Sequence, residues 1–102
     1  MGTTPEGKVK AMVKELLDGY RSRDRLHYFM PVQGGYGPAL LDFYGSHLGR
    51  FFAIETKAPG KKLTDRQHGI RSDIINSGAK VFVITDVESM KPLRAWLNGL
   101  VE

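Results

Sequence analysis

Through its middle the chain reads Leu40-Leu41-Asp42-Phe43-Tyr44-Gly45-Ser46-His47-Leu48-Gly49-Arg50-Phe51-Phe52-Ala53-Ile54-Glu55-Thr56-Lys57. Aromatic and branched residues on both sides of Leu48-Gly49 predict two strands joined by a tight turn. A two-residue loop there would place Asp42 opposite Glu55. Because side chains alternate along a strand with a period of two, Lys57 would share the face of both carboxylates. We therefore expect two acidic side chains and a lysine to meet on one hairpin.

Opposed carboxylates repel, because directly facing residues have Cβ atoms about 4.5–5.5 Å apart. A divalent cation with oxygen ligands would remove that repulsion. The alternative is a solvated charged face of an exposed hairpin. We favour a metal-dependent catalytic site because both faces of the hairpin are otherwise largely apolar, which is typical of covered strands whose charges are paired. One face carries Leu40, Phe51 and Ala53, and the other carries Phe43, Phe52 and Ile54.

The composition is that of a single soluble domain, residues 1–102, long enough to bury about two-thirds of its unfolded surface. Its net charge of +4 favours a polyanionic partner, above all nucleic acid. No apolar run reaches the length of a membrane span, and the polar beginning of the chain lacks the pattern of a signal peptide. With no cysteine present, these features predict a cytoplasmic protein without membrane contact, disulfides or thiolate metal sites.

Thr4-Pro5-Glu6 predicts a helix start, with Thr4 as N-cap and an acid near the positive end of the helix dipole. Gly19 is a candidate stop for this helix. Glu6 extends the apolar stripe, so it is either a favourable first-turn acid or a third carboxylate at the edge of the site. The stripe has helical spacing and consists of Val9, Met12, Val13, Leu16, Leu17 and Tyr20.

A second helix is predicted to start at Thr64 and to end at Gly78. Gln67 has two open explanations. Thr64 to Gln67 forms a capping box, which would account for the glutamine as a helix-start device. Gln67 also falls on one face with Ile70 and Ile74, so its amide could reach into the site. We expect Ile70, Ile74 and Ile75 on the inner side of this helix.

Further segments complete the order of elements. His27 to Val32 reads as a first strand, and the glycine-rich loop after it, residues 33–38, matches neither the dinucleotide fingerprint nor the P-loop. Its glycines would let a backbone approach closely. Lys80 to Thr85 reads as a strand buried on both faces. A last helix carries Met90, Leu93, Trp96, Leu97 and Leu100. Helix, three strands, helix, strand and helix predict an α/β (α+β) fold with a mixed β-sheet flanked by helices.

Basic residues gather in two places outside the hairpin. Arg21 and Arg23 follow the first helix and are either phosphate contacts or a solvated cluster. Lys61, Lys62 and Arg66 precede or open the second helix. We expect both groups to bind nucleic acid through its backbone, because no base-reading motif is present.

Taken in order, these motifs resemble the PD-(D/E)XK nuclease superfamily and, within it, the virus-type replication-repair nuclease (VRR-NUC) family. The resemblance covers nearly the whole chain, although Leu41 stands where the family usually has a proline before the aspartate. The matching segments, besides Glu6, are Gly35-Tyr36-Gly37-Pro38 before Asp42, Ile54-Glu55-Thr56-Lys57-Ala58-Pro59-Gly60, Leu63-Thr64-Asp65-Arg66-Gln67 and Gly78-Ala79-Lys80-Val81-Phe82-Val83-Ile84.

The resemblance implies an αβββαβ core with an added C-terminal helix and a metal-dependent DNA endonuclease. It implies that Asp42, Glu55 and the carbonyl of Thr56 hold Mg²⁺, for which Mn²⁺ would substitute. Lys57 would position the attacking water or help to deprotonate it, and Glu6 and Gln67 would support the site. No small-molecule cofactor is expected.

The resemblance also favours branched DNA as substrate, as for a Holliday-junction resolvase. Resolving a four-way junction needs two sites related by symmetry, so a homodimer is expected. The apolar residues expected to join two copies are Trp96, Leu97, Leu100, Val101, Tyr28 and Phe29. Three alternatives stay open: a flap or nicking nuclease, a non-catalytic nucleic-acid-binding module on the same fold, and an unrelated small α/β protein with a solvated hairpin.

Overall fold

The structure is a computed structural model that describes residues 4–23, 25–32 and 40–99. It contains the helices α1 (Pro5–Arg21), α2 (Asp65–Asn76) and α3 (Lys91–Leu97), with a short 3₁₀ turn η1 (Glu88–Met90) before α3. The strands are β1 (Leu26–Phe29), β2 (Phe43–His47), β3 (Arg50–Thr56) and β4 (Lys80–Ile84). The predicted order of elements is confirmed.

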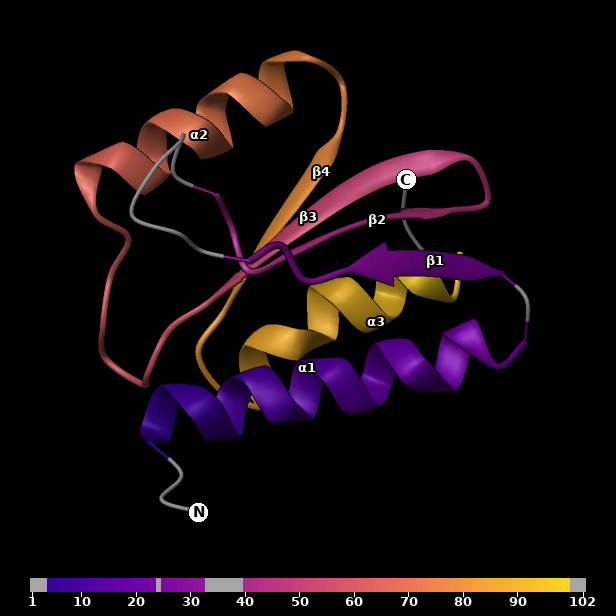
Figure 1. The fold of residues 1–102 in the computed structure, drawn as a ribbon, viewed down its shortest axis with the longest axis horizontal. Coiled ribbons are helices and arrows are strands. Elements are labelled where there is room, and N and C mark those ends of the chain that lie inside the picture. The colour runs from indigo at the N-terminus through magenta and orange to yellow at the C-terminus, as the bar shows by residue number, and fades with distance from the viewer. Residues whose placement is uncertain (1–3, 24, 33–39, 100–102) are drawn as a thin grey trace.

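The four strands form one mixed sheet in the order β1-β2-β3-β4. β1, β2 and β3 pair antiparallel, whereas β4 lies parallel to β3 because α2 carries the chain back to the same end of the sheet. The predicted α/β class with a mixed sheet is therefore confirmed. Figure 1 shows α1 and α3 on one side of this sheet and α2 on the other.

The hairpin of β2 and β3 turns at Leu48-Gly49, as expected. His47 pairs with Arg50 across a two-residue loop whose residues have φ values of 52° and 80°. Two consecutive positive φ angles are the mark of a type I′ turn, whose twist matches that of the strands it joins. This turn fixes the register of the whole hairpin, down to the pair Phe43 and Ile54.

The hydrophobic core lies between the sheet and the helices α1 and α3. Side chains that point to this face of the sheet are almost wholly buried, among them Phe43, Phe52 and Ile54. The α1 stripe supplies Val9, Val13 and Leu17 to it, and η1 and α3 supply Met90, Leu93, Trp96 and Leu97. Thr4 caps α1 by accepting a hydrogen bond from the amide of Gly7. The core thus holds the hairpin from one side and leaves its other face for α2.

Several local predictions are wrong. α1 does not stop at Gly19 but continues to Arg21 with Ser22 as C-cap, since Gly19 keeps helical geometry and no left-handed residue is needed. β1 is shorter than expected and ends at Phe29. β4 is fully buried only at Ile84, because it forms an edge of the sheet and α2 covers it incompletely. Ile75 is 39% exposed and does not face inward.

Three of the residues expected to join two copies lie in the core of the single chain. Tyr28, Trp96 and Leu97 are 5%, 2% and 4% exposed. α1 covers Tyr28, whose hydroxyl donates a hydrogen bond to Asp18, and α3 packs its own Trp96 against Phe52 and Phe82 of the sheet. Phe29 is 53% exposed. Leu100 and Val101 lie outside the described residues, as does the glycine-rich loop over residues 33–38. Within the described ranges, no helix is both long and apolar enough to cross a membrane.

Candidate active site

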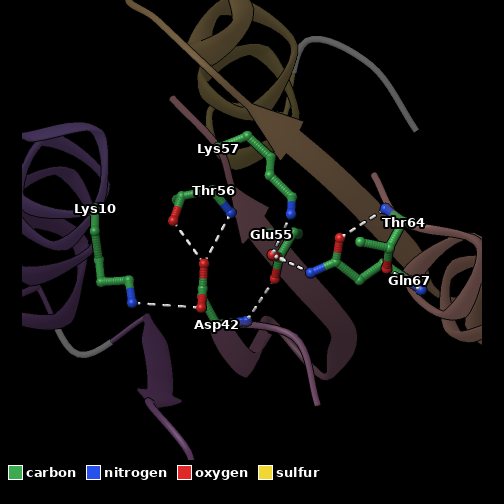
Figure 2. Close-up of polar contacts among 7 residues, drawn as sticks. All are labelled: Lys10, Asp42, Glu55, Thr56, Lys57, Thr64 and Gln67. Carbon is green, nitrogen blue, oxygen red and sulfur yellow. Dashed lines mark hydrogen bonds and ion pairs between the residues drawn. The ribbon is translucent and has the colours of Figure 1, made fainter. Parts of the chain in front are cut away.

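Asp42 and Glu55 face each other at one end of the hairpin, as the register predicts. Extending the β2–β3 pairing by one residue beyond Phe43 and Ile54 brings Asp42 opposite Glu55. The backbone amide of Asp42 donates to Oε1 of Glu55 over 3.2 Å (Figure 2). Both side chains are largely removed from solvent, with exposed fractions of 10% for Asp42 and 6% for Glu55. The site therefore contains two neighbouring carboxylates at the edge of the core.

Asp42 is held by three donors. Its Oδ2 accepts from the amide of Thr56 over 3.0 Å and from the Thr56 hydroxyl over 2.6 Å. Its Oδ1 lies 3.4 Å from Nζ of Lys10 on α1. Thr56 was expected to act through its carbonyl, and the structure adds that its amide and hydroxyl orient the aspartate.

Lys10 was not expected from the sequence. Its ammonium group reaches Asp42 at the end of the hairpin, as Figure 2 shows. The available signal was its spacing of four residues from Glu6, because residues i and i+4 share one face of a helix. If Glu6 reaches the edge of the site, the lysine one turn later lies on the same face of α1 and points the same way.

The pKa of Glu55 is strongly raised. Burial raises the pKa of Glu55 to about 7, and the negative charges of Asp42 and Glu6 add to the effect. Nζ of Lys57, 3.9 Å from Oε2 of Glu55, and the amide of Asp42 oppose it. Burial and the neighbouring carboxylate both disfavour the ionised form of Glu55. A cation bound between the two carboxylates would stabilise that ionised form.

Gln67 makes both contacts that the sequence left open. Its side-chain Oε1 accepts a hydrogen bond from the backbone amide of Thr64 over 3.0 Å. Its backbone amide donates to the Thr64 hydroxyl over 3.2 Å, so the capping box is complete. At the same time its Nε2 donates to Oε2 of Glu55 over 2.7 Å. The start of α2 is thereby fixed to the carboxylate pair (Figure 2).

Glu6 stands apart from the pair. Across the described ranges, no three Asp, Glu, His or Cys side chains gather closely enough to hold a metal ion together. Glu6 nevertheless lies near enough for its charge to raise the pKa of Glu55. The structure supports an electrostatic influence of Glu6 on the site and not a place in a three-carboxylate cluster.

The two groups of basic residues lie at different distances from the carboxylates. Lys61 and Lys62 are exposed in the segment that joins β3 to α2, and Arg66 is exposed in the first turn of α2, next to Gln67. Arg21 and Arg23 are exposed at the far end of α1, and their guanidinium groups lie 5.5 Å and 5.0 Å from the ring centres of Tyr28 and Tyr20. With a rise of 1.5 Å per residue, Arg21 is about 16 Å along the helix from Lys10. The first group lies in the chain between Lys57 and Gln67, whereas the second is at the opposite end of α1 from Lys10.

The donor set fits Mg²⁺ or Mn²⁺ in its chemistry. Mg²⁺ prefers oxygen ligands, keeps several waters and is often held by only one or two carboxylates, which is what Asp42 and Glu55 offer. Zinc sites normally use three or four nitrogen, sulfur or carboxylate ligands from the protein. The described residues contain no such group.

Comparison of the chain with models of known protein families finds no match, and comparison with curated proteins finds none either. The resemblance to the VRR-NUC family thus rests on the motifs quoted above.

Proposed function

We propose that this chain is a metal-dependent DNA endonuclease with a PD-(D/E)XK-type core. The observation that carries the proposal is the convergence of Asp42, Glu55, Lys57 and Gln67 at one end of a hairpin, with both carboxylates almost buried. A structural role alone does not account for two neighbouring carboxylates that are both largely removed from solvent, because each loses solvation and their charges repel.

Each residue has a definite task in this proposal. Asp42 and Glu55 hold the metal, and the carbonyl of Thr56 completes the protein ligands. When bound, Mg²⁺ would polarise a phosphoryl oxygen and lower the pKa of a coordinated water. Lys57 positions the attacking water or helps to deprotonate it. Gln67 orients Glu55 through the 2.7 Å hydrogen bond, and the amide and hydroxyl of Thr56 orient Asp42.

The expected substrate is branched DNA, bound through its backbone by Lys61, Lys62 and Arg66. Resolution of a four-way junction would need a homodimer, whose two sites nick symmetrically related strands. The burial of Tyr28, Trp96 and Leu97 within one chain removes three of the six apolar residues that were expected to join two copies. That observation favours the second candidate, a flap or nicking nuclease that acts as a single copy.

Incubation of the protein with labelled four-way junction, flap, nicked and plain duplex DNA in Mg²⁺ tests the proposal. Paired symmetrical nicks on the junction support the resolvase, and single nicks on the flap support the second candidate. Binding of these substrates without cleavage in either Mg²⁺ or Mn²⁺ would instead indicate a non-catalytic nucleic-acid-binding module. Sedimentation equilibrium gives the number of copies, with 11.4 kDa as the mass of a single chain.

A further inference from the structure

An exposed strip of aromatic rings crosses the sheet on the face away from the core. The rings of Phe29 and Tyr44 stack with centres 5.9 Å apart at 22°, and those of Tyr44 and Phe51 lie 5.9 Å apart at 32°. Phe29 is 53% exposed and Phe51 is 46% exposed. We call these three residues the aromatic strip. Large exposed apolar groups in contact with one another mark an interaction surface more often than scattered ones do.

The aromatic strip lies on the same face of the sheet as Glu55. Phe29 pairs with Tyr44, which pairs with Ala53, and Glu55 follows two residues later on β3. Two residues along a strand span about 7 Å. The Tyr44 hydroxyl also accepts a hydrogen bond over 3.1 Å from the amide of Leu41, the residue before Asp42. The middle ring of the strip is therefore hydrogen-bonded to the backbone beside Asp42.

A basic groove adjoins the opposite side of the strip. It has a volume of about 560 Å³ and is lined by Arg21, Arg25, His27 and Ser46, with the turn of the hairpin at its end. His27 and Ser46 are paired and stand one row beyond Phe29 and Tyr44 on the same face. Along β1 and β2 the groove, the ring pair of Phe29 and Tyr44, and the carboxylates thus follow one another, and Phe51 lies opposite Ser46 beside the groove. A groove that holds two arginines is complementary to a phosphate backbone.

We propose that the aromatic strip and the basic groove hold unpaired nucleotides of the strand that is cut. This inference rests on the proposed nuclease function and names its substrate class as DNA with a single-stranded arm or gap beside the cleaved bond. Aromatic side chains bind unpaired bases by stacking, and every base offers a face for it. In a continuous duplex both faces of each base are already stacked on neighbours, so the rings would find no partner. The order of features places the scissile phosphate at Asp42 and Glu55 and the unpaired nucleotides over the strip.

The test compares binding of a short labelled oligo(dT) and of a blunt duplex by fluorescence anisotropy in EDTA, where no cleavage occurs. The double variant Phe29→Ala/Phe51→Ala removes two rings that are already exposed, so the core stays intact. It should bind oligo(dT) at least about tenfold more weakly and the duplex nearly as the wild type does. Val87→Ala, which truncates a residue 64% exposed outside this face, is the matched control and should bind oligo(dT) unchanged. Arg21→Ala/Arg25→Ala should weaken binding of both DNAs and lower its dependence on salt.

The outcomes separate this inference from the proposed function. Selective loss of oligo(dT) binding in the ring variant supports the strip, even if the wild type cleaves no DNA in Mg²⁺ or Mn²⁺. Equal binding of oligo(dT) by the ring variant and the wild type overturns it, even if the wild type is an active nuclease. If the ring variant instead changes from dimer to monomer in sedimentation and binds oligo(dT) normally, the strip joins two copies of the chain and the inference is wrong.

Discussion

The side-chain nitrogen of Gln67 donates to Oε2 of Glu55 over 2.7 Å, while its oxygen accepts from the amide of Thr64. The side-chain amide of Gln67 therefore caps the N-terminus of α2 and orients a buried carboxylate. A side chain that only capped the helix would not need a partner on β3. This double contact couples the placement of α2 to the geometry of the carboxylate pair.

The two contacts of Gln67 can be separated by mutation. Thr64→Ala removes the capping hydroxyl and should lower the free energy of unfolding by about 1 kcal/mol with little change in cleavage. Gln67→Ala removes the cap and the hydrogen bond to Glu55, so it should also slow cleavage by about 10- to 100-fold, as loss of a group that orients a metal ligand does. Urea unfolding and single-turnover cleavage measure the two effects. Equal cleavage rates in both variants would leave the capping role as a sufficient explanation.

Compared with a Glu55→Gln variant, the metal-free protein should lose stability as the pH rises between about 4.5 and 7. The pKa of Glu55 is raised from 4.5 to about 7 by burial and by the charge of Asp42, so the folded state binds the proton more tightly than the unfolded chain. That stability is fully present below the unfolded pKa and is lost as the pH passes through the folded one. A shift of this size corresponds to about 3 kcal/mol at most.

Urea unfolding in EDTA across this pH range measures the effect. The Glu55→Gln variant is the control, because its side chain does not titrate while buried His47, whose pKa is lowered, titrates in both proteins. The difference in unfolding free energy between the wild type and the variant should therefore fall as the pH rises. A wild type and a Glu55→Gln variant that lose stability in parallel would show that another group causes the pH dependence.

Lys10 should compete with a bound cation for Asp42. Its ammonium lies 3.4 Å from Oδ1 of Asp42 and is 36% exposed, so the ion pair itself is worth at most about 1 kcal/mol. Lys10→Gln should therefore tighten Mn²⁺ binding by a few-fold, as measured by isothermal titration calorimetry. Lys8→Gln alters an exposed lysine on the same helix and should have a smaller effect. Weaker Mn²⁺ binding in Lys10→Gln would mean that Lys10 supports the metal site instead of competing with it.

Much of the hairpin could be predicted from the sequence. Leu48-Gly49 allows a two-residue turn, and alternation of side chains then determines which residues face each other, so the Asp42–Glu55 pair followed directly. The starts of α1 and α2 could also be predicted, because a threonine followed by typical first-turn residues marks an N-cap, as at Thr4 and Thr64. These features depend on neighbours close in the chain.

The parts that could not be predicted depend on how elements pack in three dimensions. Lys10 reaches Asp42 only because α1 crosses the end of the hairpin at that point. The sequence also does not show whether Trp96 is covered by its own chain or by a second copy, since an apolar residue suits both. Nor does the sequence reveal that β2 needs a glycine at position 45. A Cβ there would lie 2.3 Å from the carbonyl oxygen of His27 and 2.7 Å from the Phe52 ring.

Gly45 should consequently tolerate no larger residue. Gly45→Ala would force β1 and the Phe52 ring apart, so we expect a loss of about 3 kcal/mol in the free energy of unfolding. Gly69→Ala is a suitable control, because no atom lies within 4 Å of its added Cβ and alanine favours the α2 helix. Thermal or urea unfolding compares them. A Gly45→Ala protein as stable as the wild type would contradict the close contact between β1, Gly45 and Phe52.

Single-turnover cleavage of labelled branched DNA in Mg²⁺ tests most directly whether Asp42 and Glu55 form a nuclease site. The wild type should cleave, EDTA should prevent it, and Asp42→Asn, Glu55→Gln and Lys57→Ala should each abolish it in folded protein. Asp73→Asn changes an exposed carboxylate on α2 and should cleave at the wild-type rate. A wild type that cleaves none of the substrates in Mg²⁺ or Mn²⁺, or a Glu55→Gln variant that cleaves as fast as the wild type, would contradict the proposed site.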